Sequence, residues 1–189
     1  MRFAFHMIAC LLLACVAQPA QAKDTRASED VWQALRAGRA VAVMRHALAP
    51  GTGDPPGFWL DDCATQRNLS AEGRAQARRV GAALRANGIA AAMVKSSAWC
   101  RARDTASELG LGPVETEPSL NSFFGESSRA PAQMAALRAA IAALPRDRPA
   151  VLVTHQVVVT ALSGIYPQSG EMVVLARDGL AVLGRIPVP

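Results

Sequence analysis

The sequence predicts an α/β protein, a three-layer α/β/α sandwich around a mostly parallel sheet with an antiparallel edge strand. Two almost wholly apolar runs, residues 40–45 and 150–154, are typical of strands buried on both faces of a parallel sheet. Helical patterns separate the candidate strands, in the order β-α-β-α-β-α-β-α-β-β. The last two candidate strands, residues 171–176 and 180–186, flank a turn at 177–179 and predict a hairpin.

Start and stop signals define the helices between these strands. Ser28 caps a helix that ends before Gly38, and Ser70 caps one that stops at Asn87-Gly88. Pro131 opens an amphipathic helix whose apolar stripe we expect in the core; the stripe is Met134, Leu137, Ile141 and Leu144. The remaining candidates are helices over about 99–109 and 156–164, strands 91–95 and 114–117, and an irregular segment 119–130.

The first 22 residues have the pattern of a secretory signal peptide. Arg2 is followed by a short apolar stretch and a small-x-small cleavage site that ends at Ala22. We therefore expect a single domain over residues 23–189, in the periplasm or secreted. An alternative is lipid attachment at Cys15, which would leave an unusually short leader. No later stretch is apolar enough to cross a bilayer, so we expect no stable membrane insertion.

Charge and aromatic content argue against a nucleic-acid partner. The formal net charge is only +5, and aromatic residues make up 5% of the chain. The arginines form no long basic tract and are not interleaved with aromatic residues, as a single-strand binder needs.

After signal cleavage, Cys63 and Cys100 are the only cysteines. An even pair in an oxidising compartment favours one disulfide. Cys63 lies in a long connection, residues 47–69, that is rich in glycine, proline and aspartate. Connections of this length are typically functional or tethered, and the disulfide would supply the tether.

His46 and His155 are the only histidines beyond the signal segment, and each follows one of the buried apolar runs. The carboxyl edge of a parallel sheet is where ligands bind, so we expect both imidazoles to share one site there. Arg45 precedes His46, and Arg101 lies at the start of a predicted helix, where free N–H groups favour anions. This combination predicts a site for a tetrahedral anion. Arg103, on the same predicted helix, is expected at the surface.

Four segments in this order resemble the histidine phosphatase (phosphoglycerate mutase-like) superfamily, over about residues 40–186. They are Arg45-His46, Leu69-Ser70-Ala71-Glu72-Gly73-Arg74-Ala75-Gln76-Ala77, Ser96-Ser97 with Arg101-Ala102 and Thr105-Ala106, and His155. The resemblance implies that His46 attacks phosphorus to give a phosphohistidine. It also implies that Arg45, Arg101 and His155 hold the phosphoryl oxygens. Such phosphoryl transfer needs no metal or other cofactor.

The chain departs from the family pattern at three places. Ala47 replaces the glycine that usually follows the nucleophilic histidine, and Asn121-Ser122 stand where mutase-like members have a glutamate. Gln156 stands where acid phosphatases have an aspartate, next to His155, and we expect it to contact the substrate.

These departures leave the acid that protonates the leaving group open. Glu171 is the leading candidate, because it begins a strand that is expected to run antiparallel to its neighbour and so to start near the histidine edge. The alternatives are Glu126, Asp104 and the pair Asp61-Asp62.

The resemblance predicts an exported phosphatase that hydrolyses phosphate monoesters. Thr154-His155-Gln156 with Ser169-Gly170-Glu171-Met172 is most similar to small exported members grouped with lipopolysaccharide core heptose phosphatases. The expected partner is therefore a small phosphorylated substrate, such as a sugar phosphate or a lipopolysaccharide core. The alternative function is a phosphate-binding module on the same fold without turnover. A zinc hydrolase is disfavoured, since neither histidine has a second ligand at short spacing.

Overall fold

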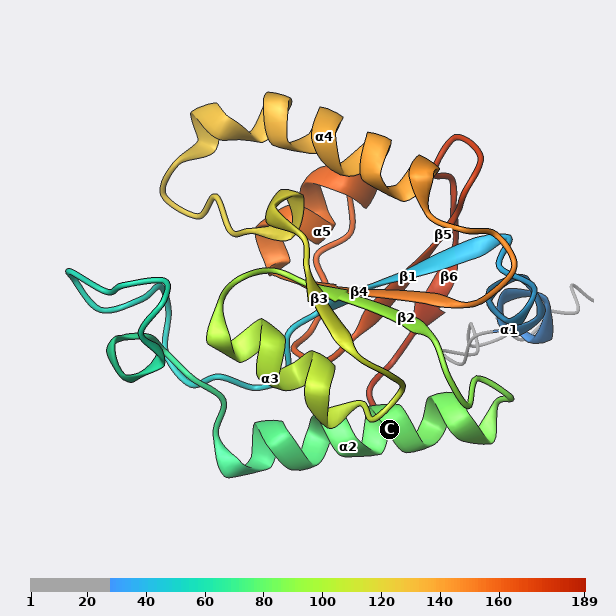
Figure 1. Ribbon diagram of the computed structural model, residues 1–189, viewed down its shortest axis with the longest axis horizontal. Helices are drawn as coiled ribbons and strands as arrows, with labels where there is room; N and C mark the ends of the chain where they lie inside the picture. The colour runs from blue at the N-terminus through green and yellow to red at the C-terminus, as the bar shows by residue number, and fades with distance from the viewer. Residues whose placement is uncertain (1–27) are drawn as a thin grey trace, which may run out of the picture.

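A six-stranded mixed sheet forms the middle layer of the computed structural model, which describes residues 28–189 (Figure 1). The predicted signal peptide, residues 1–22, and the alternative lipid site at Cys15 lie outside the described residues. The strand order is β3-β2-β4-β1-β5-β6. The strands are β1 (Ala40–Arg45), β2 (Met93–Ser96), β3 (Val114–Thr116), β4 (Ala150–Thr154), β5 (Met172–Ala176) and β6 (Val182–Ile186).

Strands β1 to β4 run parallel to one another, and antiparallel pairing is confined to one end of the sheet. There, β5 runs opposite to both β1 and β6, and β6 forms the edge. The short turn between β5 and β6 makes these two strands antiparallel, since such a turn can join only antiparallel neighbours. The strands β1 and β4 lie side by side at the centre, with Arg45 level with Thr154. The residues after these two strands, His46 and His155, therefore leave the sheet at the same edge.

Helices cover both faces of the sheet, which confirms the predicted three-layer sandwich (Figure 1). One face carries α1 (Glu29–Arg36), α2 (Ala71–Ala86) and α3 (Cys100–Glu108), and the other carries α4 (Ala130–Ala143) and α5 (Gln156–Ser163). Within β1, Ala42 and Met44 pack on the first side, whereas Val41 and Val43 pack on the second. Burial on both faces explains the continuous apolar run. Among residues 28–189, no helix combines the length and apolar character of a membrane span.

Most element boundaries agree with the sequence predictions, and the differences are local. Both β1 and β4 have the predicted bounds, whereas β2 begins at Met93 rather than at Ala91. The segment 119–130 is irregular, as expected, apart from parts of two short 3-10 turns, η2 (Pro118–Leu120) and η3 (Ser127–Arg129). The apolar stripe predicted for α4 is buried in the core.

The start of α2 fixes the chain that follows the first histidine. The Ser70 hydroxyl caps α2 by accepting the Gly73 N–H (3.0 Å), and the Leu48 N–H donates to the side chain of Gln76 (2.9 Å). A Cβ on Gly73 would lie 2.0 Å from the Leu48 carbonyl oxygen, so only glycine permits this close approach. The helix thus holds the backbone two residues beyond His46.

Candidate active site

The two imidazoles meet at the carboxyl edge of the sheet, as the sequence predicted. His46 follows β1 and His155 follows β4, and their ring centroids lie 5.4 Å apart with the planes inclined at 67°. Both residues are only 3% exposed. Two histidines separated by more than a hundred residues in the chain therefore form one buried cluster.

The hydrogen bonds of His46 define which ring nitrogen is available for reaction. Its Nδ1 lies 2.8 Å from the carbonyl oxygen of Ala47. A carbonyl oxygen can only accept, so Nδ1 carries the proton and Nε2 carries the free lone pair. The Ala47 N–H donates to the hydroxyl of Thr105 (3.0 Å), which fixes the position of this carbonyl. Ala47 does not adopt a positive φ, so alanine replaces the family's glycine without backbone strain.

Burial and positive charge keep both imidazoles neutral. Burial lowers the pKa of His46 to about 3, and the nearby charges of Arg101, Arg67 and Arg45 contribute to the lowering. Burial also holds the pKa of His155 well below its ordinary value, with the same three arginines contributing. At neutral pH the Nε2 atom of His46 is therefore unprotonated, as a nucleophile must be.

Arg45 and Arg101, the two predicted anion-binding arginines, lie close enough to act on both histidines electrostatically. An Nη1–H of Arg45 donates to the Pro167 carbonyl (3.0 Å), while both Nη groups of Arg101 donate to Asp54. The Nε–H groups of Arg45 and Arg101 are buried and make no hydrogen bond within residues 28–189. Buried donors of this kind need an acceptor, and the oxygens of an anion supply one.

Two charged residues of the site, Arg67 and Asp54, were missed by the sequence analysis. Arg67 brings a third guanidinium, held at its Nε by the Gly53 carbonyl (2.6 Å). Asp54 has a side chain only 8% exposed, in an ion pair with Arg101. Both belong to the long connection 47–69, which was predicted to be functional or tethered, but in which only Cys63 and the pair Asp61-Asp62 received roles. The sequence signal that could have identified them is their charge, because both lie in a long loop directly after the first histidine.

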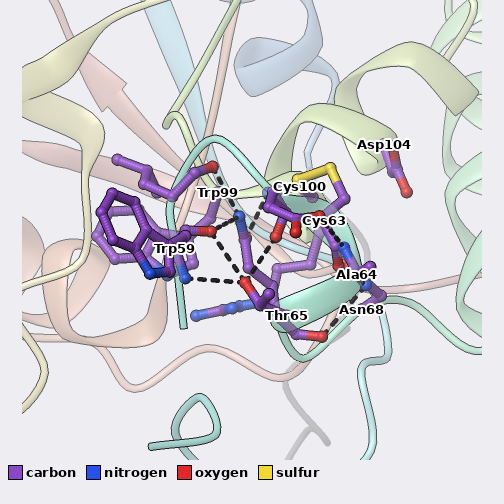
Figure 2. Close-up of a disulfide and its surroundings, with 12 residues drawn as sticks. Trp59, Cys63, Ala64, Thr65, Asn68, Trp99, Cys100 and Asp104 are labelled. Atoms are coloured by element: carbon purple, nitrogen blue, oxygen red, sulfur yellow. Dashed lines mark hydrogen bonds between the residues drawn. A yellow bond between two sulfur atoms is a disulfide. The ribbon is translucent and has the colours of Figure 1, made fainter. Parts of the chain in front are cut away.

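The predicted disulfide between Cys63 and Cys100 is confirmed, with the two Cα atoms 5.7 Å apart. It joins the short 3-10 turn η1 (Cys63–Thr65) of the loop to the start of α3 (Figure 2). The next residue of α3 is Arg101. The Cys100 N–H also donates to the side chain of Gln66 (3.0 Å), so two links hold the loop against the helix that carries Arg101.

Two backbone N–H groups at or just before the start of α3 are not free, although we expected this helix terminus to favour anions. Side chains from other segments occupy them instead: Gln66 accepts the Cys100 N–H, and Asn121 accepts the Ala98 N–H (2.9 Å). Asn121, which stands near the family's missing glutamate, therefore acts as a cap.

Ser97 and Trp99 hold the second histidine. The Nε2 atom of His155 lies 2.7 Å from the Ser97 hydroxyl, and its ring meets the Trp99 indole edge-on with centroids 5.2 Å apart. Gln156 is the first residue of α5, and its side-chain amide donates to Thr160 of the same helix (2.8 Å). Trp99 thus belongs to the cluster around His46 and His155. The Gln156 side chain, which we expected to contact the substrate, bonds within α5 instead.

Glu171 lies beside the site but its carboxylate is engaged elsewhere. Its backbone carbonyl accepts the Arg45 N–H (3.0 Å), so the residue is next to β1 as predicted. One carboxylate oxygen accepts the Gln168 N–H (2.7 Å), and the other pairs with Arg185 of β6 (2.5 Å). No hydrogen bond joins this carboxylate to His46 within the described chain. The role of Glu171 as proton donor stays a prediction, and these contacts do not support it.

The other candidate acids make surface contacts. The half-buried Asp104 pairs with Arg74 (2.6 Å), and Glu126 pairs with Arg129 (3.0 Å), where both side chains are exposed. Asp62 caps η1. In the part of the chain from residue 28 onward, no three potential metal-ligating side chains are grouped together.

A cavity of about 460 Å³ lies away from the histidines, along β2 and β3. Its charged lining consists of Lys95, Glu115, Asp147 and Arg148. Each of these side chains is paired with another member of the set, so the cavity offers no unpaired charge for a ligand. The chemistry of the molecule is concentrated at the histidine pair instead.

Comparison with known proteins agrees with the geometry. The family model described as the histidine phosphatase superfamily (branch 1) matches residues 63–129. The protein histidine phosphatase SixA complexed with tungstate shares the fold, with a TM-score of 0.55 and 19% identity over 78% of this chain and 96% of that one. A mycobacterial glucosyl-3-phosphoglycerate phosphatase complexed with VO3 gives a TM-score of 0.53 and 19% identity, over 73% and 92%.

No curated protein matches the chain. At 19% identity the two structural likenesses establish the phosphoglycerate mutase-like fold alone. The residues matched by the family model include Arg67 and Arg101, which both donate hydrogen bonds to Asp54. Over residues 63–129 the chain is thus similar to the histidine phosphatase superfamily, and the paired histidines at the sheet edge agree with that likeness.

Proposed function

We propose that this protein is a histidine phosphatase that hydrolyses phosphate monoesters through a phosphohistidine on His46. One observation carries the proposal: a neutral His46 with its lone pair on Nε2, 5.4 Å from the ring of His155 and close to two arginines with free Nε–H groups. A nucleophile surrounded by fixed cations is the minimum that phosphoryl transfer requires.

In the first step, Nε2 of His46 attacks phosphorus, and the N–P bond forms as the bond from phosphorus to the ester oxygen breaks. The Nε–H groups of Arg45 and Arg101 bind the non-bridging oxygens as negative charge spreads over them. The Nδ1–H of His46 remains bonded to the Ala47 carbonyl and stabilises the positive charge that develops on the ring. A poor leaving group takes up a proton from water at its ester oxygen, whereas a good leaving group departs as the anion.

In the second step, water attacks the phosphorus of the phosphohistidine, the N–P bond breaks, and inorganic phosphate leaves. His46 returns to its neutral form with the same proton on Nδ1. Splitting the hydrolysis in this way replaces one difficult displacement with two easier ones.

The charge of the cluster suits a phosphate monoester. Arg45, Arg67 and Arg101 contribute three positive charges and Asp54 one negative charge, which leaves two positive charges near the histidines. A phosphate monoester carries a charge of about −1.5 to −2 at neutral pH. We propose that this balance makes the site selective for monoesters over less charged esters.

We further propose that the enzyme works in the periplasm or outside the cell on small phosphorylated substrates, such as sugar phosphates or a lipopolysaccharide core. The signal-peptide pattern of residues 1–22 supports export. The disulfide between Cys63 and Cys100 supports the same conclusion, because such bonds persist in oxidising compartments.

The test uses the purified protein with para-nitrophenyl phosphate and rapid quenching in alkali. We expect the wild type to release phosphate and to accumulate an alkali-stable, acid-labile phosphohistidine. His46→Ala should lower kcat by about 10³-fold or more, as loss of a nucleophile does. Arg101→Ala should cost about 10²- to 10³-fold. Arg103→Ala is the matched control, since Arg103 is exposed on the same helix.

Two outcomes would contradict the proposal. Phosphate release that survives in His46→Ala would exclude this nucleophile. A wild type that binds inorganic phosphate but releases none from any ester in a panel of sugar, lipid, nucleotide and aryl phosphates would favour the alternative function, a phosphate-binding module.

A further inference from the structure

Asp54 is a buried carboxylate that the catalytic steps above do not use. Its Oδ1 accepts an Nη1–H of Arg101 (2.7 Å) and the backbone N–H of Arg67 (3.2 Å). Its Oδ2 accepts an Nη2–H of Arg101 (3.1 Å) and the indole N–H of Trp99 (3.0 Å). Four donors thus converge on one carboxylate whose side chain is only 8% exposed.

The side chains that donate to Asp54 are the ones that flank the histidines. The Trp99 indole lies edge-on against the ring of His155, with centroids 5.2 Å apart. The Arg101 guanidinium is 3% exposed and acts electrostatically on His46 and His155. A two-point pair between a guanidinium and a carboxylate fixes the orientation of the guanidinium plane as well as its position. One loop residue therefore sets the orientation of both neighbours of the histidine pair.

We propose that Asp54 is a positioning residue for phosphoryl transfer: it holds the Nη end of Arg101 so that the Nε–H faces the phosphoryl oxygens. The inference rests on the proposed function above. Arg45 shows the same arrangement, because the Pro167 carbonyl holds its Nη1 while its Nε–H makes no hydrogen bond within residues 28–189. Each arginine is anchored at one end and presents a donor at the other.

An opposite role for Asp54 would be that of an internal competitor, seated where the phosphoryl group binds. A carboxylate in that position would contact His46, His155 and Arg45. The donors to Asp54 are instead Arg101, Trp99 and the Arg67 backbone. Neither histidine and no group of Arg45 donates to it within residues 28–189. The geometry therefore favours positioning over competition.

The first experiment compares Asp54→Asn with the wild type, using para-nitrophenyl phosphate for turnover and calorimetry for tungstate binding. Asparagine keeps the size and one acceptor but loses the charged two-point pair. We expect kcat/KM to fall by about 10- to 100-fold, mainly through kcat, as misplacement of a catalytic group does. We expect tungstate to bind more weakly by about 10-fold, since an unanchored Arg101 loses preorganisation.

The matched control is Asp178→Asn, which removes another aspartate–arginine pair. Asp178 pairs with Arg146 (2.8 Å), and both side chains are exposed, at 85% and 52%. Both kinetic constants and the tungstate affinity should stay within about two-fold of the wild type, because exposed pairs contribute little.

A second experiment asks whether Asp54 acts through Arg101. In the Arg101→Ala background, Asp54→Asn should lower kcat/KM by less than about three-fold, because residues that act as a unit are not additive. A loss as large as in the wild-type background would overturn the proposal. Asp54→Glu, which keeps the charge, provides a second variant if asparagine prevents folding. It should retain more tungstate affinity and activity than Asp54→Ala, and equal losses would contradict positioning by charge.

Tighter tungstate binding or faster turnover in Asp54→Asn would show that Asp54 is a competitor and would overturn the inference. Failure of the proposed function would instead appear as the absence of ester turnover by the wild type. If the wild type turns over no ester, the tungstate affinities of the variants still decide whether Asp54 positions Arg101.

Discussion

Replacing Cys63 and Cys100 together with serine removes the covalent bond between the loop 47–69 and α3. The two cysteines are 37 residues apart in the chain. Closing a loop of this length removes about 13 cal/mol/K from the entropy of the unfolded chain, which corresponds to about 4 kcal/mol at 25 °C. We therefore expect the double variant to be less stable than the oxidised wild type by about 4 kcal/mol.

Equilibrium unfolding in urea measures this difference. The wild type in excess reductant should show a similar loss, whereas the double variant should not respond to reductant. A loss below about 1 kcal/mol would refute the argument from chain entropy. Equal sensitivity of both proteins to reductant would show that the reductant acts elsewhere.

The same variant should lose activity even where it is fully folded. The loop carries Asp54 and Arg67, and the disulfide holds it next to Arg101. We expect kcat/KM to fall by about 10-fold in the absence of denaturant, because the loop side chains lose their fixed positions. Unchanged kcat/KM in a destabilised variant would mean that the loop keeps its geometry without the bond.

Two remaining predictions concern acid stability and Glu171. The pKa of His46 is about 3 in the folded protein and 6.5 ordinarily, so between these values the unfolded chain binds the extra proton. The contribution of His46 to the free energy of unfolding should therefore fall by about 1.4 kcal/mol per pH unit as the pH drops through this window. Urea titrations should show a shallower dependence for His46→Asn, and equal slopes would contradict the assignment. Because Glu171 pairs with Arg185, Glu171→Gln should slow aryl and alkyl phosphates equally, by less than about three-fold; a selective loss on alkyl phosphates would identify Glu171 as the proton donor.

Local signals were sufficient for most elements of the fold. The bounds of β1 and β4 follow from apolar runs that end at polar or charged residues, and Ser70 caps α2 as predicted. The predicted start of β2 was two residues too early, because Ala91 and Ala92 are apolar and extend the pattern of a buried strand. Pairing of β2 with β4 begins only at Met93, level with Ala150, and a sequence does not display that register.

The site was predictable wherever a residue ends or directly follows a buried strand, or lies in the first turn of a helix. His46, His155, Arg45 and Arg101 were found for this reason, since the ends of neighbouring parallel strands must meet at one edge. Gln156 also follows a strand, but its amide bonds along α5 rather than toward the histidines. Position in a strand or helix predicts where a backbone lies better than where a long side chain points.

The sequence by itself determined the layers, the ends of β1 and β4, the pair of imidazoles and the cysteine pairing. These features follow from the local pattern of apolar residues and from the small number of histidines and cysteines. Only the tertiary structure decided which carboxylate meets which arginine. Asp54 pairs with Arg101 across 47 residues, and Glu171 pairs with Arg185 across the final hairpin. A carboxylate in a loop or at the start of a strand is equally suited to solvent or to any cation nearby, so its partner is fixed only when packing brings the two together.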